Sequence, residues 1–166
     1  DYLIHENHWR QVLVFVKTRQ GADRLTTFLL NKGVNTAAIH GDKSQGTRSK
    51  ALADFKAGAT RVLVATDIAA RGLDINQLPH VVNFDLPMVA QDYVHRTGRT
   101  ARAGAVGQAI SLVSADEIEQ LEAIESVIGK RLPRKLVDGF EPRHSVPESR
   151  QPCLPPRPKK PKKPKE

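Results

Sequence analysis

The stretch RVLVATDIAARGLDI (residues 61–75) decides the fold class of this chain. Its first part, RVLVA (61–65), is a continuous apolar run, the pattern of a strand buried on both faces in a parallel sheet. Five polar or turn-forming residues follow within nine positions: Thr66, Asp67, Arg71, Gly72 and Asp74. This density exceeds what a simple connection needs, so we predict a functional loop at the end of the strand. The alternative is a buried salt bridge from Arg71 to Asp67 or Asp74 that only stiffens the loop.

Similar apolar segments recur on both sides of this strand. They are QVLVFV (11–16), HVVNF (80–84), QAISLV (108–113) and the weaker NTAAI (35–39). The segments between them repeat apolar residues every three or four positions, as amphipathic helices do. These residues are Ala22, Leu25, Phe28 and Leu29; Ala51, Leu52 and Phe55; and Ile118, Leu121, Ile124 and Ile128. Before the last group, Ser114 and Glu117 form a capping-box pattern.

The alternation of strands and helices predicts an α/β fold with an open, mostly parallel sheet flanked by helices. In such sheets ligands bind in the loops beyond the carboxyl ends of the strands. We expect these loops to begin at Lys17, His40, Thr66, Asp85 and Ser114.

Length and composition indicate one domain and a tail. The chain has 166 residues, of which 39% are hydrophobic, and carries a net charge of +8. We assign residues 1–140 to the domain. Residues 141–166 hold eight prolines and, with eight Lys or Arg against three Glu, +5 of the charge. This segment is predicted to be a disordered basic tail.

Composition also excludes several classes of protein. No apolar run is long enough to cross a bilayer, and the first residues lack a secretory pattern, so we expect a soluble, cytoplasmic protein without a membrane partner. Cys153 is the single cysteine and the six histidines lack ligand spacing, so no metal site is expected within this chain.

Two further stretches indicate anion binding. In HRTGRTARAG (95–104), Arg96, Arg99 and Arg102 recur every third residue and would project from one side of a helical turn towards an anion. In HGDKSQGTR (40–48), a glycine turn precedes a serine N-cap, and backbone amides with Arg48 suit a phosphate. The alternatives are a solvated basic face and an ordinary capped helix.

Together these stretches resemble the second RecA-like domain of DEAD-box RNA helicases, over residues 11 to about 140. VLVFVKTR is similar to motif IV of that family, HGDKSQGTR to its Gln-x-x-Arg element, ATDIAARGLDI to motif V and HRTGRTARAG to motif VI. The four occur in family order. Details such as IHGDKSQ and LPHVVNFDLP resemble the bacterial RhlE group most.

The resemblance implies a role for each matching residue. Arg99 and Arg102 match arginine fingers for an ATP that is held with Mg²⁺ mainly by another lobe. Asp74, beside Gly72, matches the carboxylate that accepts the ribose hydroxyls. His95 and Arg96 match interdomain positions, although Arg96 also suits bracing the loop against Asp67. The positions that match RNA-backbone contacts are Thr18, Gly41, Gln45, Arg48 and Thr66.

The sequence departs from the family pattern in two ways. Ala101 replaces a common glycine, and there is no G-x-x-x-x-G-K-[ST] loop, Asp-Glu-Ala-Asp or Ser-Ala-Thr motif. We therefore expect a fragment of a longer enzyme that lacks the first RecA-like domain and is inactive alone, with a natural single-lobe protein as the alternative. The predicted function is the C-terminal lobe of an ATP-dependent RNA helicase.

The expected partners are RNA, an N-terminal RecA-like domain, and the ribosome or the RNA-decay machinery. The alternative function is a non-catalytic RNA-binding or annealing module. The tail is predicted to tether RNA electrostatically, with a solubilising appendage as its alternative.

Overall fold

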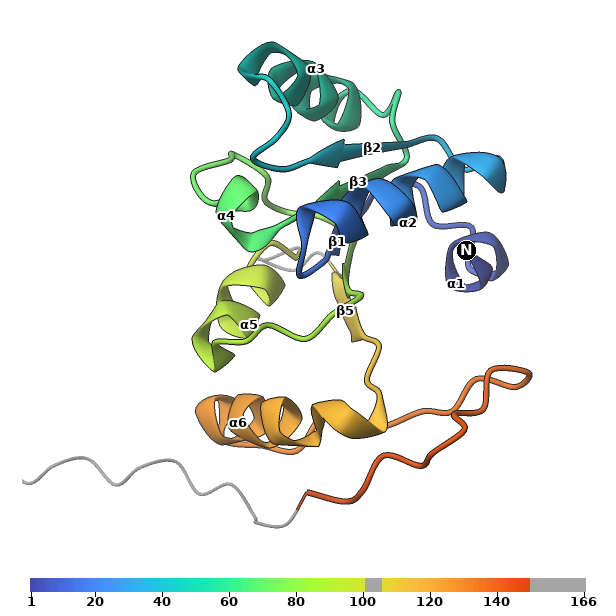
Figure 1. Ribbon diagram of the computed structural model, residues 1–166, viewed down its shortest axis with the longest axis vertical. Coiled ribbons are helices and arrows are strands. Elements are labelled where there is room, and N and C mark those ends of the chain that lie inside the picture. The colour runs from blue at the N-terminus through green and yellow to red at the C-terminus, as the bar shows by residue number, and fades with distance from the viewer. Residues whose placement is uncertain (101–105, 150–166) are drawn as a thin grey trace, which may run out of the picture.

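A parallel sheet forms the centre of the molecule. The computed structural model describes residues 1–100 and 106–149 (Figure 1). Within them the strands are β1 (Val12–Phe15), β2 (Thr36–Ile39), β3 (Val62–Ala65), β4 (His80–Asn83) and β5 (Gln108–Ser111). All pair in parallel, in the order β2-β3-β1-β4-β5. Each lies inside a segment predicted from its apolar run, so the predicted α/β architecture is confirmed.

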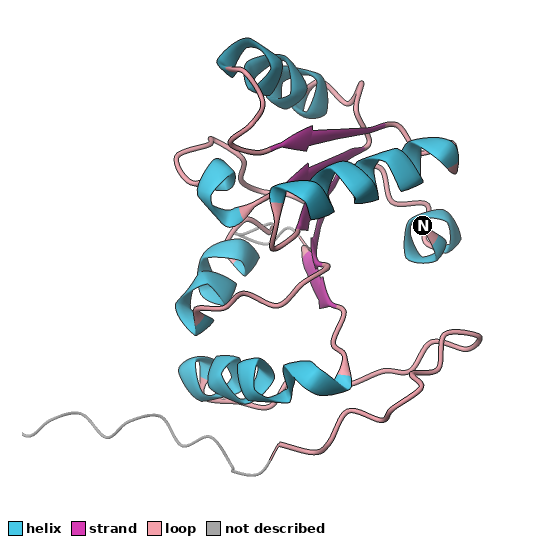
Figure 2. Cartoon of the chain, viewed as in Figure 1, coloured by secondary structure: helices cyan, strands magenta, loops and turns pink. Residues whose placement is uncertain are grey.

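Helices cover both faces of this sheet (Figure 2). Because side chains alternate along a strand, Val12 and Val14 of β1 pack with the face that α2 (Arg19–Asn31) covers, through Ala22 and Leu29. The neighbouring Leu13 and Phe15 pack instead with Ala51 and Phe55 of α3 (Gln45–Lys56). The sheet therefore separates two apolar cores, as expected of strands buried on both faces.

Three shorter helices complete the layers around the sheet. The patterns above predict neither α1 (Tyr2–Glu6) nor α4 (Asp67–Ala70), because both are too short to show a helical period. Helix α5 (Ala90–Thr97) contains Arg96 and ends before Arg99. None of the described helices combines the length and apolar character that a bilayer crossing requires.

Helix α6 (Ile118–Ile128) stacks against α5 rather than against the sheet (Figure 1). A short 3₁₀ turn, η1 (Ala115–Glu117), precedes it, and the predicted capping box of Ser114 and Glu117 is confirmed. A third apolar core, which includes Leu121 and Ile124, joins the two helices.

The chain after α6 differs from the predicted tail over residues 141–149. Val146 packs against the third core, and the Ser149 hydroxyl donates to the buried Glu125 carboxylate at 2.5 Å. Arg131 donates to the Ser149 carbonyl oxygen at 2.8 Å. Hydrogen bonds of this kind leave no hydrophobic period in the sequence. The apolar pattern therefore does not predict that residues 141–149 contact the domain. Residues 150–166 of the predicted tail lie outside the described residues.

Helix α2 corrects one predicted core position. Phe28 was expected on the buried face, but its side chain is 48% exposed, with the Lys32 ammonium 5.8 Å from the ring centre. Consecutive helical residues are rotated by about 100°, so Phe28 lies well away from the buried Leu29.

Alanine substitutions of Phe55 and Phe28 test their placement through the free energy of unfolding. Phe55→Ala removes a ring that is 0% exposed and leaves a cavity, so we expect a loss of about 3–5 kcal/mol. Phe28→Ala should cost only about 0.5 kcal/mol or less, as at most surface positions. Urea unfolding followed by circular dichroism measures both values. Equal losses would contradict the placement of the two rings.

Candidate functional site

Three of the five predicted RNA-contacting residues lie together at the carboxyl edge of the sheet, where the loops after β1, β2 and β3 meet. Thr18, Gly41 and Thr66 line one open hollow of about 340 Å³. The other lining residues are Lys17, Arg19, Gln20, Asp42 and Ile68. Three segments that are far apart in the sequence thus form one surface, rich in backbone and cationic donors.

The two threonines of this hollow begin helices. Thr18 is the N-cap of α2, and its hydroxyl oxygen accepts a hydrogen bond from Gly21 N at 2.9 Å. Thr66 precedes α4 and is buried. Both positions bring the amino end of a helix to the hollow.

Gly41 leaves room for its neighbour across the hollow. A Cβ atom at Gly41 would lie 3.4 Å from the Arg19 guanidinium carbon, at the limit of ordinary contact. Arg19 in turn pairs with Asp42 at 2.7 Å. Arg19 thus packs closely against the Gly41 backbone, with space that a methyl group would just fill.

A buried histidine that the sequence analysis did not assign to the site holds this loop in place. His40 is 1% exposed, and its Nδ1 accepts from Asp42 N at 3.2 Å. Its Nε2 therefore carries the proton and donates to Asp23 of α2 at 2.8 Å. This hydrogen bond, together with the nearby Lys43 ammonium, holds the pKa of Asp23 below its ordinary value. Chain position gave no signal of the pairing, because 17 residues separate His40 and Asp23.

Gln45 and Arg48 lie on the first turn of α3 and are not among the residues that line the hollow. The predicted N-cap is confirmed, since Ser44 Oγ accepts from Thr47 N at 3.1 Å. Gln45 is exposed, and Arg48 is half-buried. Arg48 Nε is buried without a hydrogen-bond partner among the described residues. Because this Nε is enclosed, a phosphate oxygen would have to be bound by the terminal nitrogens of the half-buried guanidinium.

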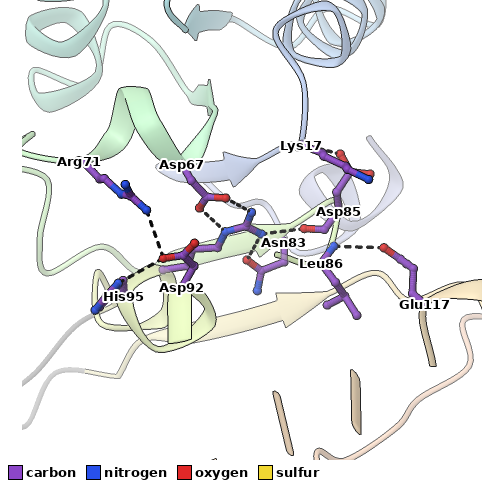
Figure 3. A network of polar contacts seen from close by, with 10 residues as sticks. Lys17, Asp67, Arg71, Asn83, Asp85, Leu86, Asp92, His95 and Glu117 are labelled. Carbon is purple, nitrogen blue, oxygen red and sulfur yellow. Dashed lines mark hydrogen bonds and ion pairs between the residues drawn. The ribbon is translucent and has the colours of Figure 1, made fainter. Parts of the chain in front are cut away.

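Arg96 is a buried brace at this edge, and Figure 3 labels its partners Asp67, Asn83 and Asp85. It donates to both Asp67 carboxylate oxygens, from Nε at 2.7 Å and from Nη2 at 2.6 Å. Its Nη1 donates to Asn83 Oδ1 at 3.1 Å and to the Asp85 carbonyl oxygen at 2.7 Å. The side chain is 2% exposed, which favours the predicted bracing against Asp67, while the interdomain contact of Arg96 stays a prediction. The burial arises because α5 turns Arg96 inward over the Phe15 ring.

Arg71 and His95 share a different carboxylate from those expected. The Arg71 guanidinium lies 3.6 Å from Asp92, and His95 Nδ1 lies 3.5 Å from the same carboxylate (Figure 3). The alternative pairing of Arg71 with Asp67 or Asp74 is therefore wrong, because Arg96 occupies Asp67 and Lys56 lies 3.5 Å from Asp74. His95 remains exposed on the surface.

Arg99 lies against the loop that holds Asp74. Its Nη1 donates to the carbonyl oxygens of Leu73 at 2.6 Å and Ile75 at 3.1 Å, and its Nη2 to that of Ala70 at 3.1 Å. Asp74 lies between Leu73 and Ile75 and is exposed. The backbone of Gly72 has a φ of +74°, which turns the loop in a way that favours glycine.

Arg96 and Arg99 do not share one side of a helix as the spacing predicted. Helix α5 ends at Thr97, and Arg99 follows in a turn whose amide donates to the Arg96 carbonyl oxygen at 3.2 Å. Arg102, the other predicted finger, lies outside the described residues. No cluster of three or more metal-ligating side chains occurs in the described part of the chain.

The strand order, together with loops that present donors and cations at one edge, defines a RecA-like α/β domain. The chain belongs to the family described as the helicase conserved C-terminal domain, which matches residues 1–104.

Curated relatives and solved structures agree with this family. The ATP-dependent rRNA helicase RRP3 of Candida glabrata is 46% identical over 137 residues, 82% of this chain and 28% of that protein. The ATP-dependent RNA helicase RhlB of Pseudomonas syringae is 46% identical over 130 residues, 78% of this chain and 33% of that protein. The chain thus spans about a third or less of the length of these relatives.

Two solved structures show the same fold. The E. coli DEAD-box protein SrmB, in complex with RraA, matches with a TM-score of 0.81 and 38% identity, covering 88% of this chain and 86% of that one. The C-terminal domain of the DEAD-box protein Dbp5 matches with a TM-score of 0.69 and 33% identity, covering 80% and 82%. The resemblance to DEAD-box C-terminal domains is confirmed, while the RhlE subgroup stays a prediction.

The buried hydrogen bonds of Arg96 predict that its removal costs much more stability than the removal of Arg71. Arg96→Ala leaves Asp67 without its cation in a largely buried place, so the domain should lose about 3–5 kcal/mol. Arg71→Ala removes a pair whose arginine is 68% exposed and should cost less than about 1 kcal/mol. Urea unfolding of the two variants tests this. A small effect of Arg96→Ala would show that the buried pair does not hold the loops.

Proposed function

We propose that this chain is the C-terminal lobe of an ATP-dependent RNA helicase. In the proposal it closes on an N-terminal RecA-like lobe, so that ATP and RNA are bound across the cleft between them. The observation that carries the proposal is the contact of Arg99 with the carbonyl groups on both sides of Asp74. It joins the proposed finger and the proposed ribose acceptor in one unit.

Arg99 is the proposed arginine finger, and Arg102 the second. A guanidinium is planar and permanently charged, so it can donate to two phosphate oxygens as charge develops on them. Arg99 lies half-buried among carbonyl groups, which keep it ordered and polarised. To reach a phosphate it exchanges these carbonyl acceptors for phosphate oxygens, so little hydrogen bonding is lost in the movement.

The residues of the nucleotide side fit this role in their chemistry. Asp74 is exposed beside Gly72 and offers carboxylate oxygens to two ribose hydroxyls. Bound Mg²⁺ would neutralise phosphate charge, and its ligands belong to the N-terminal lobe in this proposal. His95, exposed at the end of α5, is the proposed contact with that lobe.

The hollow and the start of α3 form the proposed RNA grip. Thr18, Gly41 and Thr66 offer helix amino ends and backbone amides, while Gln45 and Arg48 add side-chain donors. Such groups recognise sugar and phosphate and carry no base specificity, which suits an enzyme that acts on many RNA sequences. The ribosome and the RNA-decay machinery stay predicted partners.

The second candidate function is a non-catalytic RNA-binding or annealing module. The hollow lined by Thr18, Gly41 and Thr66 favours it, because RNA contact there needs no nucleotide. RNA-stimulated ATP hydrolysis by the two-lobe protein separates the two functions: hydrolysis supports the helicase, and its absence supports the binding module.

Arg99→Lys in a two-lobe protein should lower ATP hydrolysis by a factor on the order of 10³ or more, because lysine lacks the planar pair of donors. RNA affinity should be nearly unchanged. Arg24→Lys, on the exposed side of α2, is the matched control and should hydrolyse ATP normally. Near-normal turnover by Arg99→Lys would make Arg99 a structural residue only.

Arg48→Ala should weaken the binding of all RNA sequences to a similar extent. It should also reduce the slope of log affinity against log salt by roughly 0.7, the value for one single-strand phosphate. Lys50→Ala is the control, because Lys50 is 77% exposed on the same helix and pairs with Asp54 at 2.6 Å. Fluorescence anisotropy with labelled RNA at several salt concentrations measures both slopes. An unchanged slope for Arg48→Ala would reject the phosphate contact.

A further inference from the structure

A second hollow of about 480 Å³ opens at the carboxyl ends of β4 and β5, and none of the proposed nucleotide or RNA residues lines it. Three apolar side chains of its wall are unusually exposed: Phe84 at 43%, Met88 at 63% and Leu112 at 41%. Grouped exposed apolar side chains in a hollow indicate a binding surface.

The rim of this hollow is acidic although the whole chain is basic. Asp85, Asp116 and Glu117 line it, with Lys17 as the cation among the lining residues. Two of the carboxylates are fixed by backbone hydrogen bonds: Asp85 accepts from Lys17 N at 2.8 Å, and Glu117 accepts from Leu86 N at 3.2 Å (Figure 3). Asp116 is exposed. The hollow is therefore preformed for a ligand that combines apolar groups with positive charges.

The chain itself contains a segment of this chemistry. Residues 150–166 hold six prolines, Leu154, and seven Lys or Arg against one Glu. Proline-rich segments bind apolar, aromatic-lined grooves at little entropic cost, because their extended conformation is largely formed beforehand. The lysines and arginines supply the charge that the carboxylates of the rim lack.

The point from which this segment departs lies close to the hollow. Ser149 is bound to Glu125 of α6, and Gln120 of the same helix lines the hollow. Five residues along a helix rise about 7.5 Å. Seventeen residues in an extended polyproline conformation reach about 50 Å. The segment is therefore long enough, and its attachment raises its effective concentration at the hollow.

We propose that residues 150–166 dock in this hollow of their own chain, with leucine and proline side chains against Phe84, Met88 and Leu112. The basic side chains then lie along Asp85 and Asp116. Because Lys17 lines both hollows, the docked segment borders the proposed RNA grip. The docking itself requires neither ATP nor RNA, so it can be tested independently of the proposed function.

Cys153 makes the test direct, because it is the single cysteine and lies inside the segment. A nitroxide attached to Cys153 of the full chain broadens the amide signals of nearby residues in ¹⁵N correlation spectra. We expect the strongest loss of intensity at residues 84–88 and 112–120. Absent broadening there, or broadening confined to the residues around Ser149 from which the segment departs, would overturn the proposal.

Two charge reversals on adjacent turns provide the matched control. Asp116→Lys changes the rim and should restore most of the lost intensity, whereas Glu119→Lys makes the same charge change outside the hollow and should not. Met88→Ser removes one of the proposed apolar contacts and should also restore intensity. If Asp116→Lys and Glu119→Lys restored the same intensity, the broadening would depend on the net charge of the domain and not on the hollow. That result would overturn the proposal.

A mixed sample decides whether the contact is within one chain. Nitroxide-labelled chain without ¹⁵N is added to ¹⁵N-labelled chain without nitroxide. Unchanged intensities support docking within the chain. Broadening of the same signals in the mixture would show docking between copies and overturn the intramolecular proposal.

Discussion

The buried guanidinium of Arg96 connects the loops on which the candidate site depends. It joins α5 to Asp67 after β3 and to Asn83 and Asp85 at the end of β4, and it lies over the Phe15 ring of β1. A charge that is 2% exposed costs free energy unless nearly all of its donors are satisfied, so these loops have few alternative positions. The rigidity of the edge follows from this requirement.

The edge has two halves with different chemistry on either side of Lys17. The hollow of Thr18, Gly41 and Thr66 presents helix amino ends and cations, which favour anions. The hollow of Phe84 and Asp116 presents apolar and acidic side chains, which favour cations. A single sheet edge thus offers complementary surfaces for a phosphate backbone and for a basic segment. In the two proposals above, the basic chain binds a polyanion at one hollow and its own positively charged segment at the other.

Backbone carbonyl groups take the place of carboxylates around Arg99. Three carbonyl oxygens accept its hydrogen bonds, at Ala70, Leu73 and Ile75. A carboxylate partner would neutralise the guanidinium, whereas carbonyl groups orient it and leave its net charge available to an anion. The same contrast separates the two arginines of this motif: Arg96 is neutralised by Asp67 and is structural in this domain, while Arg99 retains its charge at the surface of the loop.

The sequence by itself determined the strands, the helices with long apolar periods, the caps at Ser44 and Ser114, and the edge at which the motif residues gather. These features follow from local periodicity and from the rule that parallel strands end at one edge. Only the tertiary structure decided which charges pair. Arg71 contacts Asp92, His40 contacts Asp23, Ser149 contacts Glu125, and Phe28 is exposed. The pairing of charged side chains depends on the distances between segments and on how each helix is rotated about its axis. Local sequence patterns determine neither quantity.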